Sequence, residues 1–368
     1  MKIVLEKNLF QTSLAKIQGI VERRSTIPIL SNILITGENN TVDIVATDLE
    51  IGVKEITKAT IIEKGTICIP ARKIYDMVRE LSEKQLEIQR GQNFWISIQS
   101  GKTIFNLPGL DPKEFPNFPE TEGVDYFNLN SKDLLEMIEK TVFSASTEES
   151  RFNLNGVYLE NIIKEEKKFL RMVATDGHRL SLIDKEAEAI LERGIILPRR
   201  GFSELRKILG DGETNVAISR KNNNCIFKTE KSIVVIRLLE GEFPDYQQVI
   251  PTSNDKQIVI DRKNFVGCLR RANVIASEKG EGVKFSIKEG KMEIHTGGPD
   301  VGEVKEEVEI NYEGEPVSIS FNIKYILDVL NILETEKIRL ELKEESSAGV
   351  IKPTEGENYL YVIMPMRL

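Results

Sequence analysis

The residues that could perform acid–base or nucleophilic chemistry gather around Asp176, His178 and Ser181. A histidine beside an acid can move a proton, and a nearby serine could then act as nucleophile. Such a serine normally stands in a glycine-flanked turn, and those glycines are missing here. Only two histidines occur in the chain, and the other, His295, lies in a separate strand-like stretch. Asp176 also has a counterpart in Asp48, and a repeated acid is more simply a turn cap.

A second chemical candidate is the stretch Gly101-Lys102-Thr103, which has the ending of a phosphate-binding loop. In that motif an earlier glycine would fall at the position of Ile96, and a helix would follow the loop. Here the stretch lies between two strand-like segments. The sequence therefore predicts no phosphate site at this position.

Composition limits the class of protein further. Cys68, Cys225 and Cys268 are isolated and odd in number, so they are typical of reduced, buried thiols in a cytosolic protein rather than of a metal site or a disulfide framework. Hydrophobic content of 40% and charged content of 29% indicate an ordinary globular chain. No stretch approaches the ~20 apolar residues of a membrane span, and Met1–Leu5 reads as a strand rather than a signal peptide. We expect a cytoplasmic protein without cofactor or metal.

The elements that must position any functional residue are organised by a pattern that occurs three times. Each copy has an apolar residue, a helix-start residue (Pro or Asn), a cation two places later, apolar residues at helical spacing and a closing Leu. The copies span residues 69–81, 197–209 and 321–333. Proline suits the start of a helix because its missing N–H is not needed there. The apolar stripe predicts three helices that pack on something larger.

The repeat extends beyond these helices. Pro70 and Pro198, Thr47 and Thr175, and Phe115 and Phe243 are each 128 residues apart. Such a long period indicates duplicated domains, since solenoid repeats have periods of roughly 20–50 residues. With the third helix, the sequence predicts three similar domains, at about 1–125, 126–255 and 256–368.

Each domain has a second predicted helix nearer its start, over residues 7–24, 131–145 (with Ser131 as N-cap) and 261–277. Alternating segments such as 42–47 and 94–98 predict antiparallel strands, and the apolar run 233–236 predicts a more buried strand. Each domain is therefore expected to be α+β, with two helices on antiparallel sheets. The Pro-rich stretches 107–119 and 242–251 are the expected linkers.

Charge is divided between the helices and the rest of the chain. Taken as helices, the six segments 7–24, 70–83, 131–145, 198–209, 261–277 and 321–333 carry a net charge of +8; since the whole chain carries −8, the remainder carries −16. Helices that shared one face would give it a basic surface suited to a phosphate backbone. Solvated helix surfaces are, however, often rich in Lys and Arg, so the imbalance gains weight mainly from the triplicated architecture.

Four segments together resemble one family, the bacterial DNA sliding clamps, which are the beta subunits of DNA polymerase III. They are residues 25–32 (STIPILSN), 46–50 (ATDLE), 174–181 (ATDGHRLS) and 364–368 (MPMRL). The resemblance covers all three domains. It implies a head-to-tail homodimeric ring of six similar units, which encircles duplex DNA and tethers the polymerase. It also implies a non-catalytic protein.

The resemblance implies three sets of site residues. The DNA-binding candidates are Arg24, Arg72, Lys73, Arg151, Phe152, Asn153, Arg199 and Arg200. Relatives often carry an aromatic pair at the positions of Phe152 and Asn153. A ring that holds DNA by topology needs only weak, sequence-independent phosphate contacts, so each cation is expected to contribute little by itself.

The second set is a pocket for short peptides rich in Gln, Leu and Phe, from the polymerase III catalytic subunit, the clamp loader and other proteins with a clamp-binding motif. Its positions are Leu154, Thr175, Gly177, His178, Arg179, Leu180, Pro244, Val249, Asn322, Tyr325, Val362, Met364, Pro365, Met366, Arg367 and Leu368. Methionines in the tail fit such a role because their side chains adapt to varied apolar partners. A frayed last strand is the simpler alternative. At this edge Gln248 stands where some relatives have Arg.

The third set is the dimer interface, implied at Phe105, Leu107, Val274 and Ile275. Phe105 and Leu107 alternate at strand spacing, so they could continue a sheet across two subunits. They could equally belong to the internal core. A second function also remains open from the residues: an acidic α+β hydrolase that uses Asp176 and His178 and forms no ring.

Overall fold

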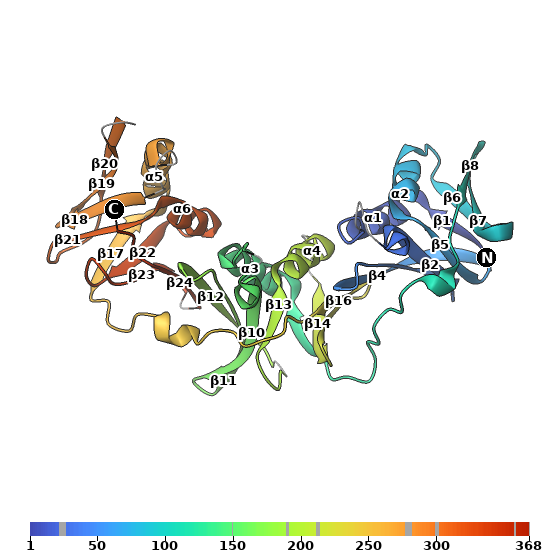
Figure 1. Cartoon of the computed structure of the whole chain (residues 1–368), viewed down its shortest axis with the longest axis horizontal. Helices are drawn as coiled ribbons and strands as arrows, with labels where there is room; N and C mark the ends of the chain where they lie inside the picture. Colours follow the sequence, from blue (N-terminus) through green and yellow to red (C-terminus); the bar gives the residue numbers. More distant parts are fainter. Residues whose placement is uncertain are drawn as a thin grey trace. The chain divides into compact units, whose positions relative to one another are not determined.

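A computed structural model describes residues 1–21, 27–148, 150–188, 191–210, 214–276, 282–298, 302–356 and 358–367. The chain divides into two compact units. Figure 1 labels most of their helices and strands. Unit 1 comprises Met1–Lys132 and Arg200–Leu238, and unit 2 comprises Asp133–Arg199 and Leu239–Leu368. Each unit thus combines one whole sequence repeat with half of the middle repeat.

Unit 1 is built on a sheet of twelve antiparallel strands. They are β1 (Lys2–Glu6), β2 (Asn32–Glu38), β3 (Thr41–Thr47), β4 (Ile51–Glu63), β5 (Gly65–Pro70), β6 (Gln85–Arg90), β7 (Trp95–Ser100), β8 (Thr103–Pro108), β9 (Phe127–Asn130), β14 (Asn215–Lys221), β15 (Asn224–Lys228) and β16 (Ser232–Arg237). Its helices are α1 (Lys7–Ile17), α2 (Ala71–Glu80) and all but the first residue of α4 (Arg199–Leu209). Helices α1 and α2 lie side by side, and α1 packs on β1, β3 and β4.

Unit 2 has one sheet of eight strands and one of four, again antiparallel. The strands are β10 (Gly156–Lys164), β11 (Lys167–Thr175), β12 (Arg179–Glu186), β13 (Ile195–Pro198), β17 (Lys256–Asp261), β18 (Gly282–Lys288), β19 (Lys291–Gly298), β20 (Gly302–Glu309), β21 (Val317–Asn322), β22 (Lys337–Leu342), β23 (Gly349–Pro353) and β24 (Tyr359–Ile363). Its helices are α5 (Arg262–Ala276), α6 (Ile323–Ile332) and most of α3 (Ser131–Thr141). Helix α5 packs against α6 and the strands β19 and β20.

The same strand pairing links consecutive repeats in both units. In unit 1, β4 pairs with β16, so that Gly52 faces Val235. In unit 2, β12 pairs with β24, so that Leu180 faces Val362. The strands β8 and β20 end their sheets, and each has one neighbouring strand in the described part of the chain. Interrepeat contact is therefore made through backbone ladders as well as side chains.

The three helices of the repeated pattern are confirmed. Asn322 caps α6, because its Oδ1 accepts hydrogen bonds from the backbone N–H groups of Lys324 and Tyr325 at 2.9 and 3.2 Å. Proline precedes the other two helices, at Pro70 and Pro198. The α+β character and the strands predicted at 42–47, 94–98 and 233–236 are also confirmed.

Three details of the helix predictions were wrong. The helix predicted over 131–145 ends at Thr141 and is followed by a short 3-10 helix, Val142–Ser144. The first helix ends at Ile17 instead of continuing to residue 24. Gly19 follows it closely, and a side chain there would overlap Glu204, whose Oε2 lies 2.0 Å from the position of a Cβ. Ser131 is the first helical residue and not the cap; the Oδ1 of Asn130 accepts the hydrogen bond from the N–H of Lys132 at 2.8 Å.

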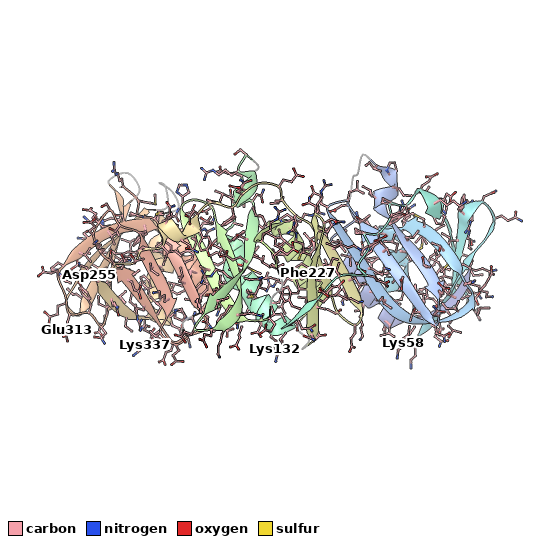
Figure 2. The ribbon with its side chains drawn as sticks, turned by 90° about the horizontal axis from the view of Figure 1, so that it is seen from below. Lys58, Lys132, Phe227, Asp255, Glu313 and Lys337 are labelled. Carbon is pink, nitrogen blue, oxygen red and sulfur yellow. The ribbon has the colours of Figure 1, made fainter. Side chains whose placement is uncertain are left out.

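The cores consist of the inward faces of these sheets and helices. In unit 1, Phe227 is 1% exposed and meets Phe202 edge-on at 6.4 Å between ring centres. Charged side chains such as Lys58, Asp255 and Glu313 lie at the surface (Figure 2). Within the described part of the chain, no helix is both long and apolar enough to cross a membrane.

Candidate functional site

Asp176 organises a tight turn between β11 and β12. Its Oδ1 accepts hydrogen bonds from the N–H groups of His178 and Arg179 at 2.9 and 3.0 Å. The Oγ1 of Thr175 accepts from the N–H of Gly177 at 3.1 Å. Gly177 has φ +88°, a conformation that glycine adopts without strain. The acid is thus used to hold the backbone.

The counterpart turn in unit 1 has the same bonds. The Oδ1 of Asp48 accepts from the N–H groups of Glu50 and Ile51 at 3.0 and 2.6 Å, and the Oγ1 of Thr47 accepts from Leu49 at 3.0 Å. This repetition confirms the interpretation of both acids as turn caps.

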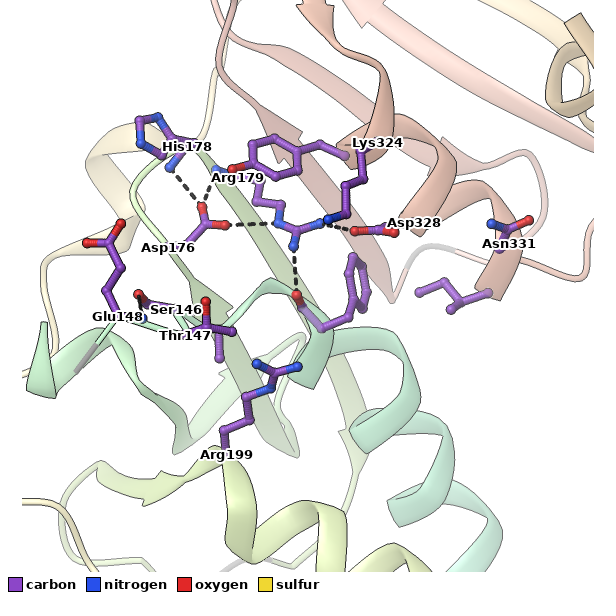
Figure 3. Close-up of a pocket in the computed structure, with 14 residues that line it drawn as sticks. Ser146, Thr147, Glu148, Asp176, His178, Arg179, Arg199, Lys324, Asp328 and Asn331 are labelled. Carbon is purple, nitrogen blue, oxygen red and sulfur yellow. Dashed lines mark hydrogen bonds and ion pairs between the residues drawn. The ribbon is translucent and has the colours of Figure 1, made fainter. Parts of the chain in front are cut away.

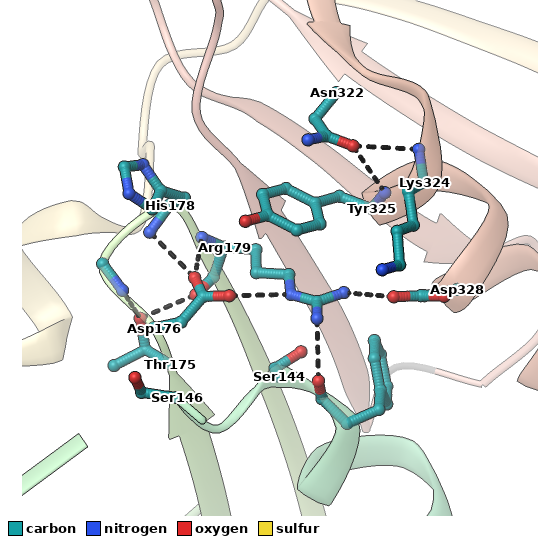
Figure 4. A network of polar contacts seen from close by, with 12 residues as sticks. Ser144, Ser146, Thr175, Asp176, His178, Arg179, Asn322, Lys324, Tyr325 and Asp328 are labelled. Atoms are coloured by element: carbon teal, nitrogen blue, oxygen red, sulfur yellow. Dashed lines mark hydrogen bonds and ion pairs between the residues drawn. The ribbon is translucent and has the colours of Figure 1, made fainter. Parts of the chain in front are cut away.

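The hydrolase alternative finds no support in this geometry. His178 meets Asp176 through its backbone N–H, and its ring points away from the carboxylate (Figure 4). Ser181 is buried, and its hydroxyl lies 2.5 Å from that of Ser144. The three side chains therefore do not converge on a substrate position.

Arg179 is the centre of a polar network that joins the middle and third repeats (Figure 4). Its Nε donates to the Oδ2 of Asp176 at 3.0 Å, and its Nη1 donates to the Oδ2 of Asp328 at 2.6 Å. Its Nη2 donates to the carbonyl oxygen of Phe143 at 2.9 Å. The guanidinium also lies 4.3 Å from the ring centre of Tyr325. Arg179 is thus held by two carboxylates, a carbonyl and an aromatic ring.

Burial and neighbouring charges shift the pKa of Arg179 in opposite directions. Only 10% of its side chain is exposed, and burial by itself would lower its pKa. Interactions with Tyr361, Asp328 and Asp176 more than offset burial, so the pKa of Arg179 is raised above its ordinary value. Its charge is permanent at any physiological pH.

The network borders a polar pocket of about 590 Å³ (Figure 3). His178, Arg179 and Tyr325 of the predicted partner pocket line it, together with Arg199 of the DNA-binding candidates. Its other lining residues are Phe143, Ala145, Ser146, Thr147, Glu148, Asp176, Lys324, Asp328, Asn331 and Ile332. Its wall contains both acids and bases, so the pocket has no single sign of charge.

The opposite face of the same strands is apolar. Leu180 and Val362, which face each other on β12 and β24, are 2% and 1% exposed. They form a cluster with Val173, Leu182, Val350 and Tyr246, and the segment 243–250 packs on it through Phe243, Tyr246 and Ile250. Pro244 and Val249 of that segment are exposed. We call Thr175, Gly177, Leu180, Pro244, Val249, Val362 and Met364 the linker–tail surface.

The C-terminal tail is fixed beyond the last strand. The N–H of Met364 donates to the carbonyl oxygen of His178 at 2.9 Å, and that of Met366 to Ser320 at 2.7 Å. Pro365, Met366 and Arg367 line a second pocket, of about 700 Å³, with Lys284, Ser320, Glu344, Glu345 and Ser346. The alternative of a frayed end is therefore wrong for Met364–Met366, while Leu368 lies outside the described residues.

The predicted partner residues thus divide among three neighbouring places: the polar pocket, the linker–tail surface and the tail pocket. Asn322 lies at the helix cap next to Tyr325. Leu154 is the last residue of the short 3-10 helix Phe152–Leu154. Its N–H donates to the carbonyl oxygen of Arg151, and its own carbonyl oxygen accepts from the N–H of Ser146. The structure brings most of these residues together. The guanidinium of Arg179, however, already binds Asp176, Asp328 and the carbonyl oxygen of Phe143 within the chain.

The DNA-binding candidates differ in their surroundings. Arg72 is 74% exposed, and Lys73 is also exposed. Arg200 lies with its Nη1 2.6 Å from the Oδ2 of Asp48, whose side chain is only 2% exposed. Arg151 pairs with Glu148 at 3.1 Å and donates to the carbonyl oxygen of Asp176 at 2.8 Å. Arg200 and Arg151 therefore have structural partners, which the sequence did not indicate.

Four further candidates need separate mention. Asn153 donates through Nδ2 to the carbonyl oxygen of Glu242 at 2.9 Å. Arg199 begins α4 and lines the polar pocket. Arg24 lies outside the described residues, as does the side chain of Phe152.

The predicted interface residues lie near the two sheet edges. Phe105 is half-buried and Leu107 is 4% exposed, both on β8. Val274, at the end of α5, is 68% exposed, and Ile275 is half-buried. Leu107 therefore belongs to the internal core, whereas Val274 is open to solvent in the single chain.

Sequence reasoning missed Asp328, Phe143 and Tyr246, which support the site from other elements. A signal existed for Tyr246, because it stands 128 residues after Phe118.

The expectations for the cysteines are confirmed: all three are free and buried, and burial raises the pKa of Cys68 and Cys225 to about 12. Among the described residues, no group of three or more His, Cys, Asp or Glu could hold a metal ion.

Comparison with known proteins gives three consecutive family matches. Residues 1–119 match the DNA polymerase III beta subunit, N-terminal domain; residues 128–245 match the central domain, and residues 247–367 match the C-terminal domain. The beta sliding clamps of Pseudomonas putida and Caulobacter vibrioides are each 32% identical to this chain, over 100% of both sequences.

Solved structures agree. The beta sliding clamp of C. crescentus has a TM-score of 0.94 at 33% identity, covering 100% of this chain and 99% of that one. The DNA polymerase sliding clamp of Bacillus subtilis gives 0.94 at 31% identity, with coverage of 100% and 99%. The DNA polymerase III beta subunit of Thermotoga maritima gives 0.90 at 33% identity, with the same coverage.

Proposed function

Because the chain belongs to the DNA polymerase III beta subunit family, the bacterial sliding clamps, we propose that two copies close head to tail into a ring around duplex DNA. The protein is a replicative processivity factor, an accessory subunit and not an enzyme. Within the proposal, residues 1–125, 126–255 and 256–368 are its three domains. The 128-residue repeat and the three consecutive family matches support this division.

The observation that carries the ring is the order of the sheet edges. Strand β4 of the first repeat pairs with β16 of the second, and β12 of the second pairs with β24 of the third. By the same rule β20 of the third repeat would pair with β8 of a first repeat. Both strands end their sheets, so a second copy can supply each missing neighbour, and a two-fold arrangement satisfies both edges at once.

Repeat counterparts of the expected interface residues support the same arrangement. Val235 and Val362, which face the preceding repeat across β4 and β12, correspond to Leu107 on β8. Phe143 corresponds to Val274, since each follows its helix cap (Asn130 or Asp261) by thirteen residues. Phe143 stacks on Tyr361 of β24 with ring centres 5.9 Å apart. The exposed Val274 would make the equivalent contact on β8 of the other copy.

The DNA-binding part of the proposal depends on charge rather than on base contacts. Arg72 and Lys73 at the start of α2 are exposed cations suited to phosphate contact, and Arg24, Arg151, Phe152, Asn153, Arg199 and Arg200 complete the proposed set. Because a closed ring cannot fall off its substrate, weak contacts suffice and sliding stays possible.

We propose that peptide segments of other proteins dock on the linker–tail surface and the neighbouring tail pocket. Val249 and Pro244 offer exposed apolar contact on the segment 243–250, which itself packs on buried Leu180 and Val362, and the tail methionines can adapt to different partners. The polymerase III catalytic subunit, the clamp loader and other proteins with a clamp-binding motif are the proposed partners. The family's action on bacterial DNA supports a cytoplasmic location.

The test combines solution mass with DNA topology. We expect sedimentation to give twice the mass of the 41.7 kDa chain. After loading, the protein should remain on closed circular DNA and be lost when the circle is linearised. A monomer at working concentration, or equal loss from both DNA forms, would contradict the ring.

A further inference from the structure

The two junctions between consecutive repeats share one strand register. The fifth residue of β4, Glu55, lies opposite the first residue of β16, Ser232. The fifth residue of β12, Ile183, lies opposite the first residue of β24, Tyr359. Pairing of a fifth residue with a first residue therefore occurs at both junctions that the chain contains.

A lysine on a helix of the earlier repeat accompanies each of these strand pairs. Lys16 on α1 and Lys140 on α3 both stand ten residues after the cap of their helix. The Nζ of Lys16 lies 3.4 Å from the Oε2 of Glu55 and donates to the Oγ of Ser232 at 3.4 Å. The Nζ of Lys140 lies 5.6 Å from the ring centre of Tyr359. At both junctions the cation thus contacts the first residue of the strand from the next repeat.

The third repeat has the same two positions next to the edge of its sheet. Arg271 on α5 stands ten residues after the helix cap Asp261, and Glu306 is the fifth residue of β20. The Nε and Nη2 of Arg271 donate to the Oε1 and Oε2 of Glu306 at 2.6 and 2.7 Å. Strand β20 ends its sheet, so within the described part of the chain no strand from a next repeat lies beside this pair.

The exposure of the two ion pairs differs as a covering strand would make it differ. The side chain of Glu55 is 3% exposed and that of Lys16 is 26% exposed, with β16 alongside. The side chain of Glu306 is 19% exposed and that of Arg271 is 59% exposed. The pair of the third repeat is therefore formed within one chain but remains open on the side where β16 covers its counterpart.

Strand β8 has a residue suited to this open side. It ends the sheet of unit 1, and its first residue, Thr103, is exposed. Thr103 and Ser232 thus hold the same position in β8 and β16, and each carries a hydroxyl group. A hydroxyl group can donate to a carboxylate and can accept from a cation, so Thr103 could contact either member of the Arg271–Glu306 pair.

We propose that the Arg271–Glu306 pair is a binding site for β8 of a second copy of this chain. Thr103 of the other copy lies opposite Glu306, and its hydroxyl group contacts the ion pair as Ser232 contacts Lys16 in unit 1. The inference rests on the proposed ring and gives it a defined register, in which β20 and β8 pair fifth residue to first. A dimer contains this contact twice.

Disulfide cross-linking of the full-length chain tests the register. Thr103→Cys is combined with Glu306→Cys in a Cys268→Ala background, because the native Sγ lies only 3.2 Å from the Nη2 of Arg271. Residues directly opposite in antiparallel strands have Cα atoms about 4.5–5.5 Å apart, which suits a disulfide. We expect oxidation to give a covalent dimer that a reducing agent separates.

The matched control shifts the cysteine by one residue. Ile104→Cys with Glu306→Cys, in the same background, should cross-link at least about tenfold more slowly, because adjacent side chains of a strand point to opposite faces. Equal cross-linking of the two cysteine pairs, or none in a protein that sediments as a dimer, would overturn the register. A wild-type chain that stays monomeric would instead count against the proposed ring itself.

A milder substitution tests the hydroxyl contact without new thiols. Thr103→Val keeps the shape of the side chain and removes a hydrogen bond to a charged group twice per dimer, so the dimer dissociation constant should rise about tenfold or more. Thr60→Val, at an exposed position on β4 of the same unit, should leave the constant unchanged. Sedimentation equilibrium measures both variants, and equal constants would overturn the role of the hydroxyl group.

Discussion

Arg179 and Asp328 stand 149 residues apart in sequence, yet the Nη1 of the arginine lies 2.6 Å from the Oδ2 of the aspartate. The pair connects β12 of the middle repeat with α6 of the third. In unit 1 the repeat counterparts of these residues do not pair; Arg200 on α4 pairs with Asp48 in the turn instead. In each unit, an ion pair thus connects two consecutive repeats. The earlier repeat supplies the arginine in unit 2 and the aspartate in unit 1.

We expect Arg179→Ala to loosen the junction within unit 2. The change leaves the carboxylates of Asp328 and Asp176 without their cation, and breaking a partly buried pair costs about 2–3 kcal/mol. Hydrogen exchange of the β12 and β24 amides should accelerate by a factor of about 30 to 150, which is this free energy converted at 1.36 kcal/mol per factor of ten. Asp328→Asn, which can still accept a hydrogen bond, should have a smaller effect. Unchanged exchange rates in Arg179→Ala would disprove the role assigned to this network.

Arg200→Ala should destabilise unit 1, whereas Arg72→Ala should not. The two arginines occupy the same repeat position, but Arg200 pairs with the buried Asp48, and Arg72 is exposed with only a 3.9 Å approach to Asp76. We expect a loss of about 1–3 kcal/mol for Arg200→Ala and of less than about 0.5 kcal/mol for Arg72→Ala.

Urea unfolding followed by the fluorescence of Trp95, the single tryptophan, reports on unit 1. For DNA binding we expect the opposite order of effects, because Arg72 is exposed to phosphate whereas Arg200 is paired with Asp48. Arg72→Ala should reduce the salt dependence of DNA association more than Arg200→Ala does. Equal stability losses would argue against the Asp48 pair.

Glu55 gives unit 1 a pH dependence of defined sign. Burial is the largest influence and raises its pKa above 4.5, although Lys16 and Ser232 oppose that shift. The folded state then holds the proton more tightly than the unfolded state. This contribution to stability is therefore present below about pH 4.5 and is lost as pH rises through the folded-state pKa.

Glu55→Gln should consequently raise the melting temperature of unit 1 at pH 7–8, and the gain should shrink toward pH 4. Scanning calorimetry across this range measures it, with Glu50→Gln as an exposed control. A variant that melts lower than the wild type at every pH would show that the pair with Lys16 outweighs burial.

Deletion of residues 364–368 should abolish peptide binding and leave the dimer intact. The deletion removes Met364 and Met366, which are held by hydrogen bonds to His178 and Ser320, and the apolar wall of the tail pocket. Neither sheet edge proposed for the ring includes this segment. Fluorescence anisotropy with a labelled peptide and sedimentation measure the two properties; unchanged peptide affinity would refute the assignment of the tail.

Several features were predictable because they depend on residues close together in sequence. The repeated helices appear in the spacing of apolar side chains, and Asn322 marks a helix start through a bond to its own third neighbour. The turn role of Asp176 followed from its repetition at Asp48. The end of the first helix at Ile17 was missed although Gly19, a residue type typical of helix ends, follows it by two positions; the close approach of Glu204 to Gly19 is visible only in the fold.

By itself, then, the sequence determined the triplication, the helices and strands of each repeat, the buried thiols and the family. Only the tertiary structure decided that Arg179 faces Asp328, that Arg200 is engaged by Asp48, and that Phe118 and Tyr246 pack on the sheets of their units. The reason is physical. Periodicity records contacts between near neighbours along the chain, whereas ion pairs, sheet edges and the resting place of a ring depend on distances between segments that the fold alone brings together.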